Sequence, residues 1–201
     1  MKLTRARFVP ATLLTLLALT LSAFAQDQKA QQRAAFPQIK IKNFGQMDER
    51  FYRGAQPKEG DYRDLAALGI KTIIDLRDNP TDYERPAAEA AGMRYVNIPM
   101  SDKDYPKDEQ INAFLRLAND PATGKFYVHC AGGRHRTGVA GAVYRFNVNH
   151  WDYDRVYAEM KFYDFYTRFG HGDMKKYVED YWQKVQAQHT QHAAAAAAAT
   201  H

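Results

Sequence analysis

The chain has 201 residues and a formal net charge of +5, from 28 basic and 23 acidic residues. Three basic residues and no acidic ones precede residue 26, so the rest of the chain carries 25 basic against 23 acidic residues, or +2. That balance argues against nucleic acid and acidic membrane surfaces as partners. The 176 residues after position 25 suffice for one domain with a sizeable core, and we expect a monomer.

Residues 1–25 have the pattern of a cleavable bacterial signal peptide. Basic residues come first, an apolar run follows over residues 11–21, and Ala23-Phe24-Ala25 forms an A-x-A cleavage site. The apolar run is shorter than the roughly 20 residues that span a bilayer. The single cysteine, Cys130, lies far from the cleavage site, so no lipid-bearing cysteine would anchor the mature chain. We therefore expect a periplasmic or secreted protein without a membrane anchor.

Residues 26–42 are polar and are expected to form a linker or N-terminal extension, ahead of a domain over 43–189. Within that domain, patterns typical of strands and helices alternate. Expected strands are 50–56, 71–77, 93–99 and 125–129, and expected helices are 59–68, 83–91, 107–118 and 137–146. The alternation predicts an α/β domain with a central, mainly parallel sheet flanked by helices.

The C-terminal third of the chain is rich in aromatic residues at helical spacing, which indicates helix packing against the core. Tyr163, Arg168 and His171 are candidates for the rim of a pocket. The alanine- and histidine-rich residues 190–201 are expected to be a low-complexity tail, as frayed helix or disorder.

The most informative segment is His129-Cys130-Ala131-Gly132-Gly133-Arg134-His135-Arg136-Thr137-Gly138. A buried strand should precede it and a tightly packed helix should follow it. A strand, a glycine-rich loop and a helix N-terminus together form an anion cradle, because backbone N–H groups and the helix dipole favour negative charge there. A cysteine at the start of such a cradle ionises easily. The segment therefore predicts a thiolate nucleophile, Cys130, beside a bound phosphate.

Each neighbour of this cysteine has an expected role. The phosphoryl oxygens would be held by the loop residues Ala131, Gly132, Gly133, Arg134, His135 and Arg136. Arg136 can also fold its guanidinium over the phosphate as a fork. The Thr137 hydroxyl is placed to hydrogen-bond the sulfur and ease its departure. His129 is expected to point away from the substrate, to order the loop through hydrogen bonds and to help set the thiol pKa.

The motif at 129–138 resembles the signature loop of the protein tyrosine phosphatase superfamily. Residues 51–57 and 69–77 are similar to bacterial relatives of the atypical fungal- and plant-type members of its compact dual-specificity branch. The resemblance covers roughly residues 43–185. It implies a dual-specificity-phosphatase-like fold and a reaction through a phosphocysteine, with no metal and no cofactor.

The same resemblance implies a general acid, because the leaving group needs a proton. The family places an aspartate ahead of a proline on a loop upstream of the signature. Asp102 is favoured because Pro106 stands four residues beyond it, whereas Met100 replaces the tryptophan of the usual Trp-Pro-Asp motif. Asp104 lies on the same loop and remains an alternative.

These residues predict a cysteine-dependent phosphatase that hydrolyses phosphomonoesters of the phosphotyrosine or dual-specificity type. Arg134 and His135 would add positive charge to the cradle, which makes inositol polyphosphates, pyrophosphates or phytate an alternative substrate class. A non-catalytic module that binds phosphorylated ligands is a second alternative, although Cys130, Arg136 and Thr137 are all present. Sulfur transfer of the rhodanese type is a third, and the upstream aspartate loop fits it less well.

Overall fold

The central sheet has five strands in the order β1-β2-β5-β3-β4. Its strands are β1 (Gly45–Gln46), β2 (Phe51–Ala55), β3 (Ile70–Arg77), β4 (Arg94–Met100) and β5 (Lys125–Cys130). β1 pairs with β2 antiparallel and the remaining pairs are parallel. The carboxyl ends of the four longer strands therefore meet at one edge, as expected for a mainly parallel sheet. The two residues of β1 are too few to leave a pattern in the sequence.

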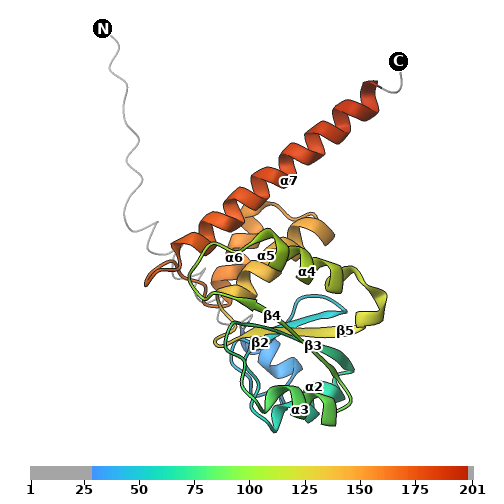
Figure 1. Cartoon of the computed structure of the whole chain (residues 1–201), viewed down its shortest axis with the longest axis vertical. Helices are drawn as coiled ribbons and strands as arrows, with labels where there is room; N and C mark the ends of the chain where they lie inside the picture. The colour runs from blue at the N-terminus through green and yellow to red at the C-terminus, as the bar shows by residue number, and fades with distance from the viewer. Residues whose placement is uncertain (1–28, 199–201) are drawn as a thin grey trace. The chain divides into compact units, whose positions relative to one another are not determined.

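The computed structural model describes residues 29–198, so the predicted signal segment and the last three residues lie outside the described part. Of the described residues, 29–37 belong to one unit and 38–198 to another, which holds the sheet and all labelled helices (Figure 1). Residues 29–35, within the expected linker or N-terminal extension over 26–42, are helical. No helix within residues 29–198 combines the length and the apolar composition needed to cross a bilayer.

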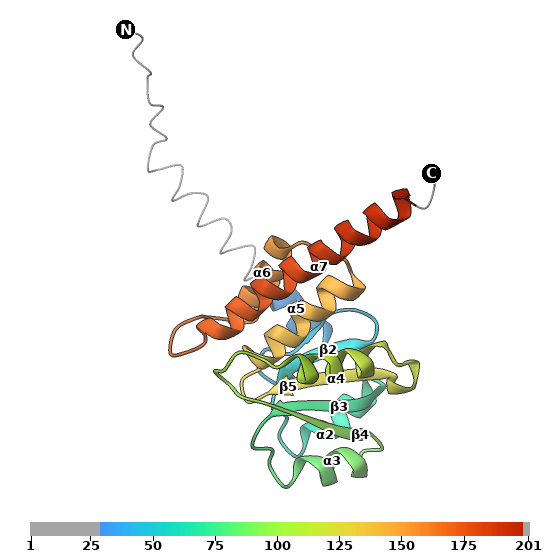
Figure 2. The ribbon, with the colours of Figure 1, turned by 45° about the horizontal axis from the view of Figure 1, so that its top comes forward.

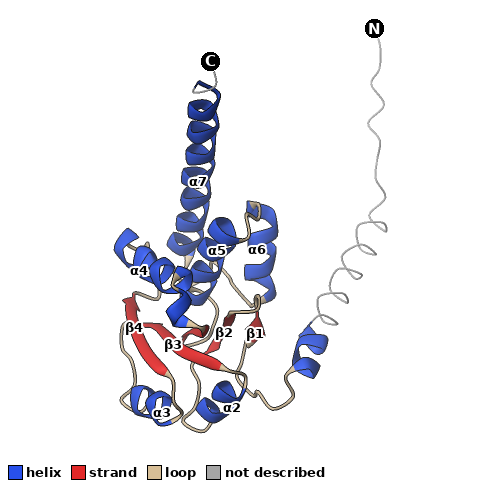
Figure 3. Ribbon diagram, turned by 90° about the vertical axis from the view of Figure 1, so that its right-hand side faces the viewer, coloured by secondary structure: helices blue, strands red, loops and turns tan. Residues whose placement is uncertain are grey.

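Helices cover both faces of the sheet. They are α2 (Asp61–Ala67), α3 (Glu84–Ala90), α4 (Asp108–Asn119), α5 (Arg136–Val148), α6 (Tyr153–Phe162) and α7 (Gly172–Ala198), with a short 3-10 turn at Pro121–Thr123. α2 and α3 lie on one face and α4 to α7 on the other (Figure 3). α7 packs along α5 (Figure 2). The predicted α/β fold is confirmed, and the tail is helical as far as Ala198, with exposed side chains over 186–196.

Strand alternation decides which side chains meet the functional helix. On β5, Phe126, Val128 and Cys130 share the core that α5 covers, whereas the intervening Tyr127 and His129 point to the opposite face. α5 is buried along its first eleven residues, and its glycines and alanines allow it to lie close to the sheet. The sequence therefore places Cys130 beneath the helix whose N-terminus faces it.

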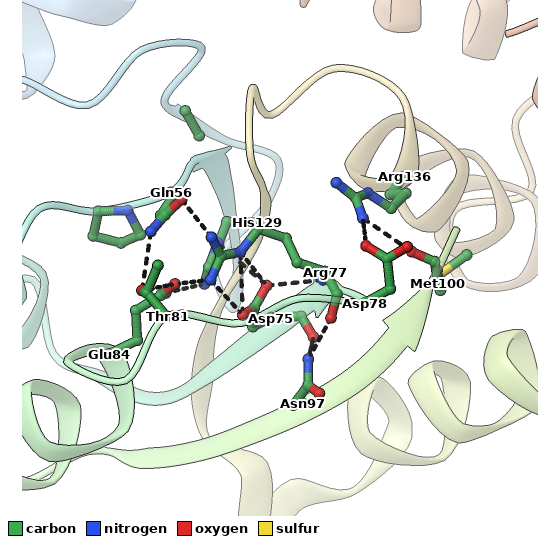
Figure 4. A network of polar contacts seen from close by, with 12 residues as sticks. Gln56, Asp75, Arg77, Asp78, Thr81, Glu84, Asn97, Met100, His129 and Arg136 are labelled. Atoms are coloured by element: carbon green, nitrogen blue, oxygen red, sulfur yellow. Dashed lines mark hydrogen bonds and ion pairs between the residues drawn. The ribbon is translucent and has the colours of Figure 1, made fainter. Parts of the chain in front are cut away.

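The face toward α2 and α3 holds a buried ion cluster of Asp75, Arg77, Glu84 and His129 (Figure 4). Arg77 pairs with Asp75 at 3.3 Å and with Glu84, and His129 Nε2 lies 3.1 Å from Glu84 Oε2. Burial would raise the pKa of Glu84, but the hydrogen bond and charge of His129, together with Tyr62 and Arg77, hold it below its usual range. The cluster ties β3 and β5 to α3.

Replacing Glu84 with glutamine should lower the free energy of unfolding by about 3 kcal/mol at pH 7, because it leaves the buried guanidinium of Arg77 short of a partner. The depressed pKa of Glu84 fixes the sign of the pH dependence. Its stabilisation is complete above the ordinary carboxyl pKa of roughly 4.3 and is lost as pH falls through the folded-state value. Urea unfolding at pH 7 and pH 3 measures both effects.

The matched control is Glu89→Gln on the same helix, where the carboxylate is more than half exposed and, among residues 29–198, forms an ion pair with Arg85 alone. That change should lower the free energy of unfolding by less than about 0.5 kcal/mol. Equal losses for the two variants would contradict a structural role of the ion cluster.

Candidate active site

The signature loop, residues 130–136, joins the end of β5 to the first residue of α5, in the predicted strand–loop–helix order. Three consecutive carbonyl oxygens of the loop accept hydrogen bonds from outside it. The donors are Gln56 N to Ala131 O at 3.4 Å, Asn43 Nδ2 to Gly132 O at 2.9 Å and Arg53 Nη2 to Gly133 O at 2.7 Å. In a trans peptide the following N–H points opposite to the carbonyl. The amides of residues 132–134 are therefore turned into the loop, which is the geometry of an anion-binding nest.

Gly133 is required by the close approach of β2. Its φ is +65°, and a Cβ there would lie 2.6 Å from the Ala55 nitrogen and closer still to the Gly54 carbonyl group. Gly132 has no such restriction, since a Cβ there would meet only the Arg134 side chain at 3.7 Å. The close approach of β2 therefore requires glycine at position 133 and not at position 132.

Gly133→Ala should lower the free energy of unfolding by roughly 2–4 kcal/mol, from the left-handed backbone and the clash with β2. Gly132→Ala, its neighbour in the same loop, should change it by less than about 1 kcal/mol. Denaturant unfolding of the two variants makes the comparison. A similar cost at both positions would show that the loop backbone is not held against β2.

Cys130 is 4% exposed and is the one cysteine in the sequence. Burial by itself would raise the pKa of the thiol. The hydroxyl and amide of Thr137, the charge of Arg136 and the amide of Arg134 outweigh burial and lower the pKa below its ordinary value. The Thr137 hydroxyl is buried, and none of its contacts with residues 29–198 meets both the distance and the angle of a hydrogen bond. It therefore acts on the Cys130 sulfur through its dipole. The site therefore favours a thiolate.

Arg136 is almost fully buried, and residues at the carboxyl ends of β3 and β4 fix its guanidinium. Its Nη1 donates to Asp78 Oδ1 and to the Met100 carbonyl oxygen, both at 2.9 Å (Figure 4). These contacts use one terminal nitrogen of the guanidinium and leave Nε and Nη2 for a ligand. Asp78 follows β3 and Met100 ends β4, so the sheet edge itself orients the arginine.

The loop after β4 carries Asp102 and Asp104, both with exposed side chains. The loop is held at two points: His171 Nδ1 donates to the Asp102 carbonyl oxygen at 2.9 Å, and the Tyr105 hydroxyl donates to Asp180 Oδ2 at 2.8 Å. The Asp102 carboxylate lies close enough to His135 to favour the protonated form of that ring. Asp102 therefore lies beside the signature loop.

His135 is packed in a stack of rings. Its ring lies parallel to that of His171, with centroids 3.6 Å apart, and edge-on to Tyr166 at 4.4 Å. Burial first, and the neighbouring His171 second, lower the pKa of His135 to about 4. The ring is neutral at pH 7, which corrects the expectation that His135 adds charge to the cradle. Arg134 lies in the same loop, with its guanidinium carbon 6.0 Å from the centre of the Tyr166 ring.

A family model described as "DSP-PTPase phosphatase fused to NAD+ Kinase" matches residues 28–178. The chain belongs to this phosphatase family. The dual specificity protein phosphatase TpbA of Pseudomonas aeruginosa strain UCBPP-PA14 is 29% identical over 149 residues, which are 74% of this chain and 63% of TpbA. The match thus spans less than two thirds of that relative. Membership of the family confirms the predicted recognition and, at the level of the family, the class of phosphoric monoester hydrolases.

Solved structures give the same result for the fold. The crystal structure of P. aeruginosa TpbA superposes with a TM-score of 0.60 at 27% identity, over 70% of this chain and 84% of that one. The Siw14 catalytic core superposes with a TM-score of 0.60 at 19% identity, over 70% of this chain and 85% of that one. At that identity, Siw14 supports the fold alone.

Two histidines that the sequence singled out make contacts that the sequence did not indicate. His129 points away from the cradle as predicted, but its ring nitrogens face Glu84 and Asp75, and no hydrogen bond within residues 29–198 joins its ring to the signature loop. His171 is not merely at a rim, since it links the Asp102 loop to His135.

Ligand atoms of Asp75, Glu84 and His129 lie within 4.8 Å of one another, a spacing at which a metal could be held. Arg77 already pairs with both carboxylates, so its charge occupies the place that a cation would take. The group is therefore an ion-pair cluster of the fold.

Sequence reasoning missed Asp78, which orients Arg136, and Arg53, which holds the Gly133 carbonyl. The signal for Asp78 was available, because an acidic residue directly after a parallel strand lies at the ligand-binding edge of the sheet. Arg53 lies inside a strand and gave no comparable signal.

Proposed function

We propose that this chain hydrolyses phosphomonoesters of the phosphotyrosine or dual-specificity type through a phosphocysteine intermediate. The observation that carries the proposal is the cradle itself. A thiol with a lowered pKa, inward-turned loop amides and the oriented guanidinium of Arg136 converge at the N-terminus of α5. Such a site binds a phosphoryl group and attacks it.

In the first step, the Cys130 thiolate attacks phosphorus, and a sulfur–phosphorus bond forms as the phosphorus–oxygen bond to the leaving group breaks. Asp102 gives its proton to the departing oxygen. In the second step, Asp102 takes a proton from water, which attacks phosphorus and releases inorganic phosphate and the thiolate. Arg136 and the loop amides hold the equatorial oxygens throughout, and the Thr137 dipole stabilises the departing sulfur.

A phosphotyrosine-type substrate is supported by a TpbA variant that has been crystallised in complex with phosphotyrosine, at 25% identity to this chain. A second substrate class, inositol polyphosphates, is favoured by the basic residues near the cradle. Arg134 lies within the loop, and Lys103 on the Asp102 loop packs against Gly170, next to the exposed Arg168. Several phosphates on one small molecule would engage such charges together.

The test is phosphate release from para-nitrophenyl phosphate, a phosphotyrosine peptide and phytate, under reducing conditions and with EDTA. Release that survives chelation supports cysteine chemistry, and the peptide should be preferred over phytate. Preference for phytate would move the assignment to the inositol polyphosphate class. Tight binding of the phosphopeptide without release of phosphate would instead favour a non-catalytic binding module. Sulfur transfer from thiosulfate would favour the hypothesis of a rhodanese-type enzyme.

We also propose export to a bacterial periplasm or beyond, with removal of residues 1–25. The support is the basic, apolar and Ala-x-Ala sequence of that segment. Intact mass measurement on the protein from fractionated bacterial cells tests it. The mature chain should begin at Gln26 and be found outside the cytoplasm, and a cytoplasmic chain retaining residues 1–25 would contradict export.

A further inference from the structure

Arg53 is a buried cation next to the signature loop. It lies in the middle of β2 and is 1% exposed. Its guanidinium carbon is 4.0 Å from the centre of the Tyr163 ring, and Nη1 is 3.3 Å from where a Cβ on Gly141 of α5 would stand. Within residues 29–198 its one hydrogen bond goes to the Gly133 carbonyl oxygen, and its Nε is buried without a partner.

The charge of Arg53 also lacks an ion pair. No carboxylate oxygen of the described residues lies within 4.0 Å of it, whereas the buried Arg77 and Arg145 each pair with a glutamate. Glu159 is the carboxylate whose charge acts most strongly on Arg53, but it already forms an ion pair with Arg145 at 2.6 Å. An unpaired buried cation is costly, and burial lowers the pKa of Arg53. Among the groups that oppose this lowering is the ionised Cys130.

We propose that Arg53 is a positioning residue of the signature loop, whose otherwise unpaired charge is balanced by the Cys130 thiolate and by the phosphate bound above it. Its hydrogen bond fixes the Gly133 carbonyl, and this turns the amide of Arg134 toward the sulfur. The loop then favours an anion through Arg53 as well as through Arg136. This inference rests on the proposed function in naming phosphate as the bound anion. The effect of Arg53 on the Cys130 thiol does not depend on that function.

Two substitutions separate the parts of this role. Arg53→Met removes the charge and the hydrogen bond while filling much of the same volume. Arg53→Lys keeps a charge but loses the planar fork that can stack on Tyr163 and reach Gly133 at once. The matched control is Arg50→Met in the turn before β2, because Arg50 also donates to backbone carbonyls, those of Gly124 and Asp120, away from the signature loop.

The experiment is the pH dependence of alkylation by iodoacetamide, which reports on Cys130 alone because the chain has no other cysteine. Arg53→Met should raise the pH midpoint of alkylation by about one unit. At a fixed pH below the midpoint, the fraction of Cys130 present as thiolate should then fall about tenfold. Arg53→Lys should shift it by less, and Arg50→Met should leave it unchanged. In parallel, the rise in melting temperature on adding inorganic phosphate should be smaller in Arg53→Met than in the wild type.

The proposal is overturned if both Arg53 variants keep the wild-type alkylation midpoint and the wild-type response to phosphate. If Arg53→Met does not fold, Arg53→Lys decides, since loss of the fork alone should raise the midpoint. Alkylation needs no turnover. A wild-type protein that releases no phosphate, but whose midpoint depends on Arg53, would defeat the proposed function and leave this inference standing.

Discussion

Cys130→Ser is expected to reduce phosphate release by at least about 10⁴-fold while the protein stays folded. Serine has nearly the same shape as cysteine, so the core around residue 130 should tolerate it. Its hydroxyl, however, is hardly ionised under conditions that favour the Cys130 thiolate. The amides and the charge of Arg136 that lower the thiol pKa cannot supply the nucleophile that the reaction needs.

The measurement is single-turnover phosphate release from para-nitrophenyl phosphate, with circular dichroism to establish folding. The same variant should still bind a phosphotyrosine peptide, because Arg136 and the loop amides are unchanged. Binding without turnover identifies Cys130 as the nucleophile. Turnover close to the wild-type rate would exclude a phosphocysteine mechanism, whatever the peptide affinity.

The parts of this site that sequence could predict are those encoded locally. Cys130, the glycine-rich loop and Arg136 follow one another within seven residues, and the strand before them and the helix after them have clear patterns. The chain alternates strand and helix, so the edge of the sheet at which they meet also follows from the sequence. The family resemblance then supplies the region of the general acid.

The parts that sequence could not predict depend on contacts between distant segments. Arg53 reaches Gly133 across 80 positions, and His171 reaches Asp102 across 69. The neutral state of His135 has the same origin. Its pKa of about 4 arises from burial and from the electrostatic effect of the neighbouring His171, neither of which a local pattern encodes.

The second large effect concerns the general acid. Asp102→Asn should lower kcat for a phosphotyrosine peptide by about 10²-fold, because the tyrosine oxygen must be protonated as it leaves. The loss should be much smaller for para-nitrophenyl phosphate, whose leaving group is stable as an anion. Steady-state kinetics on the two substrates measures this difference, and a variant that has merely lost structure would lose activity on both alike.

Asp104→Asn is the matched control, since Asp104 lies two residues further along the same exposed loop. The backbone amide of Asp104 donates to Ser101 Oγ at 3.2 Å, a contact that asparagine preserves, so kcat should stay within about twofold of the wild type. The Asp102 carbonyl is held by His171, and the Asp102 carboxylate acts on His135 within the cradle. If Asp104→Asn instead carries the loss that depends on the leaving group, Asp104 is the general acid and the anchoring by His171 serves the loop backbone alone.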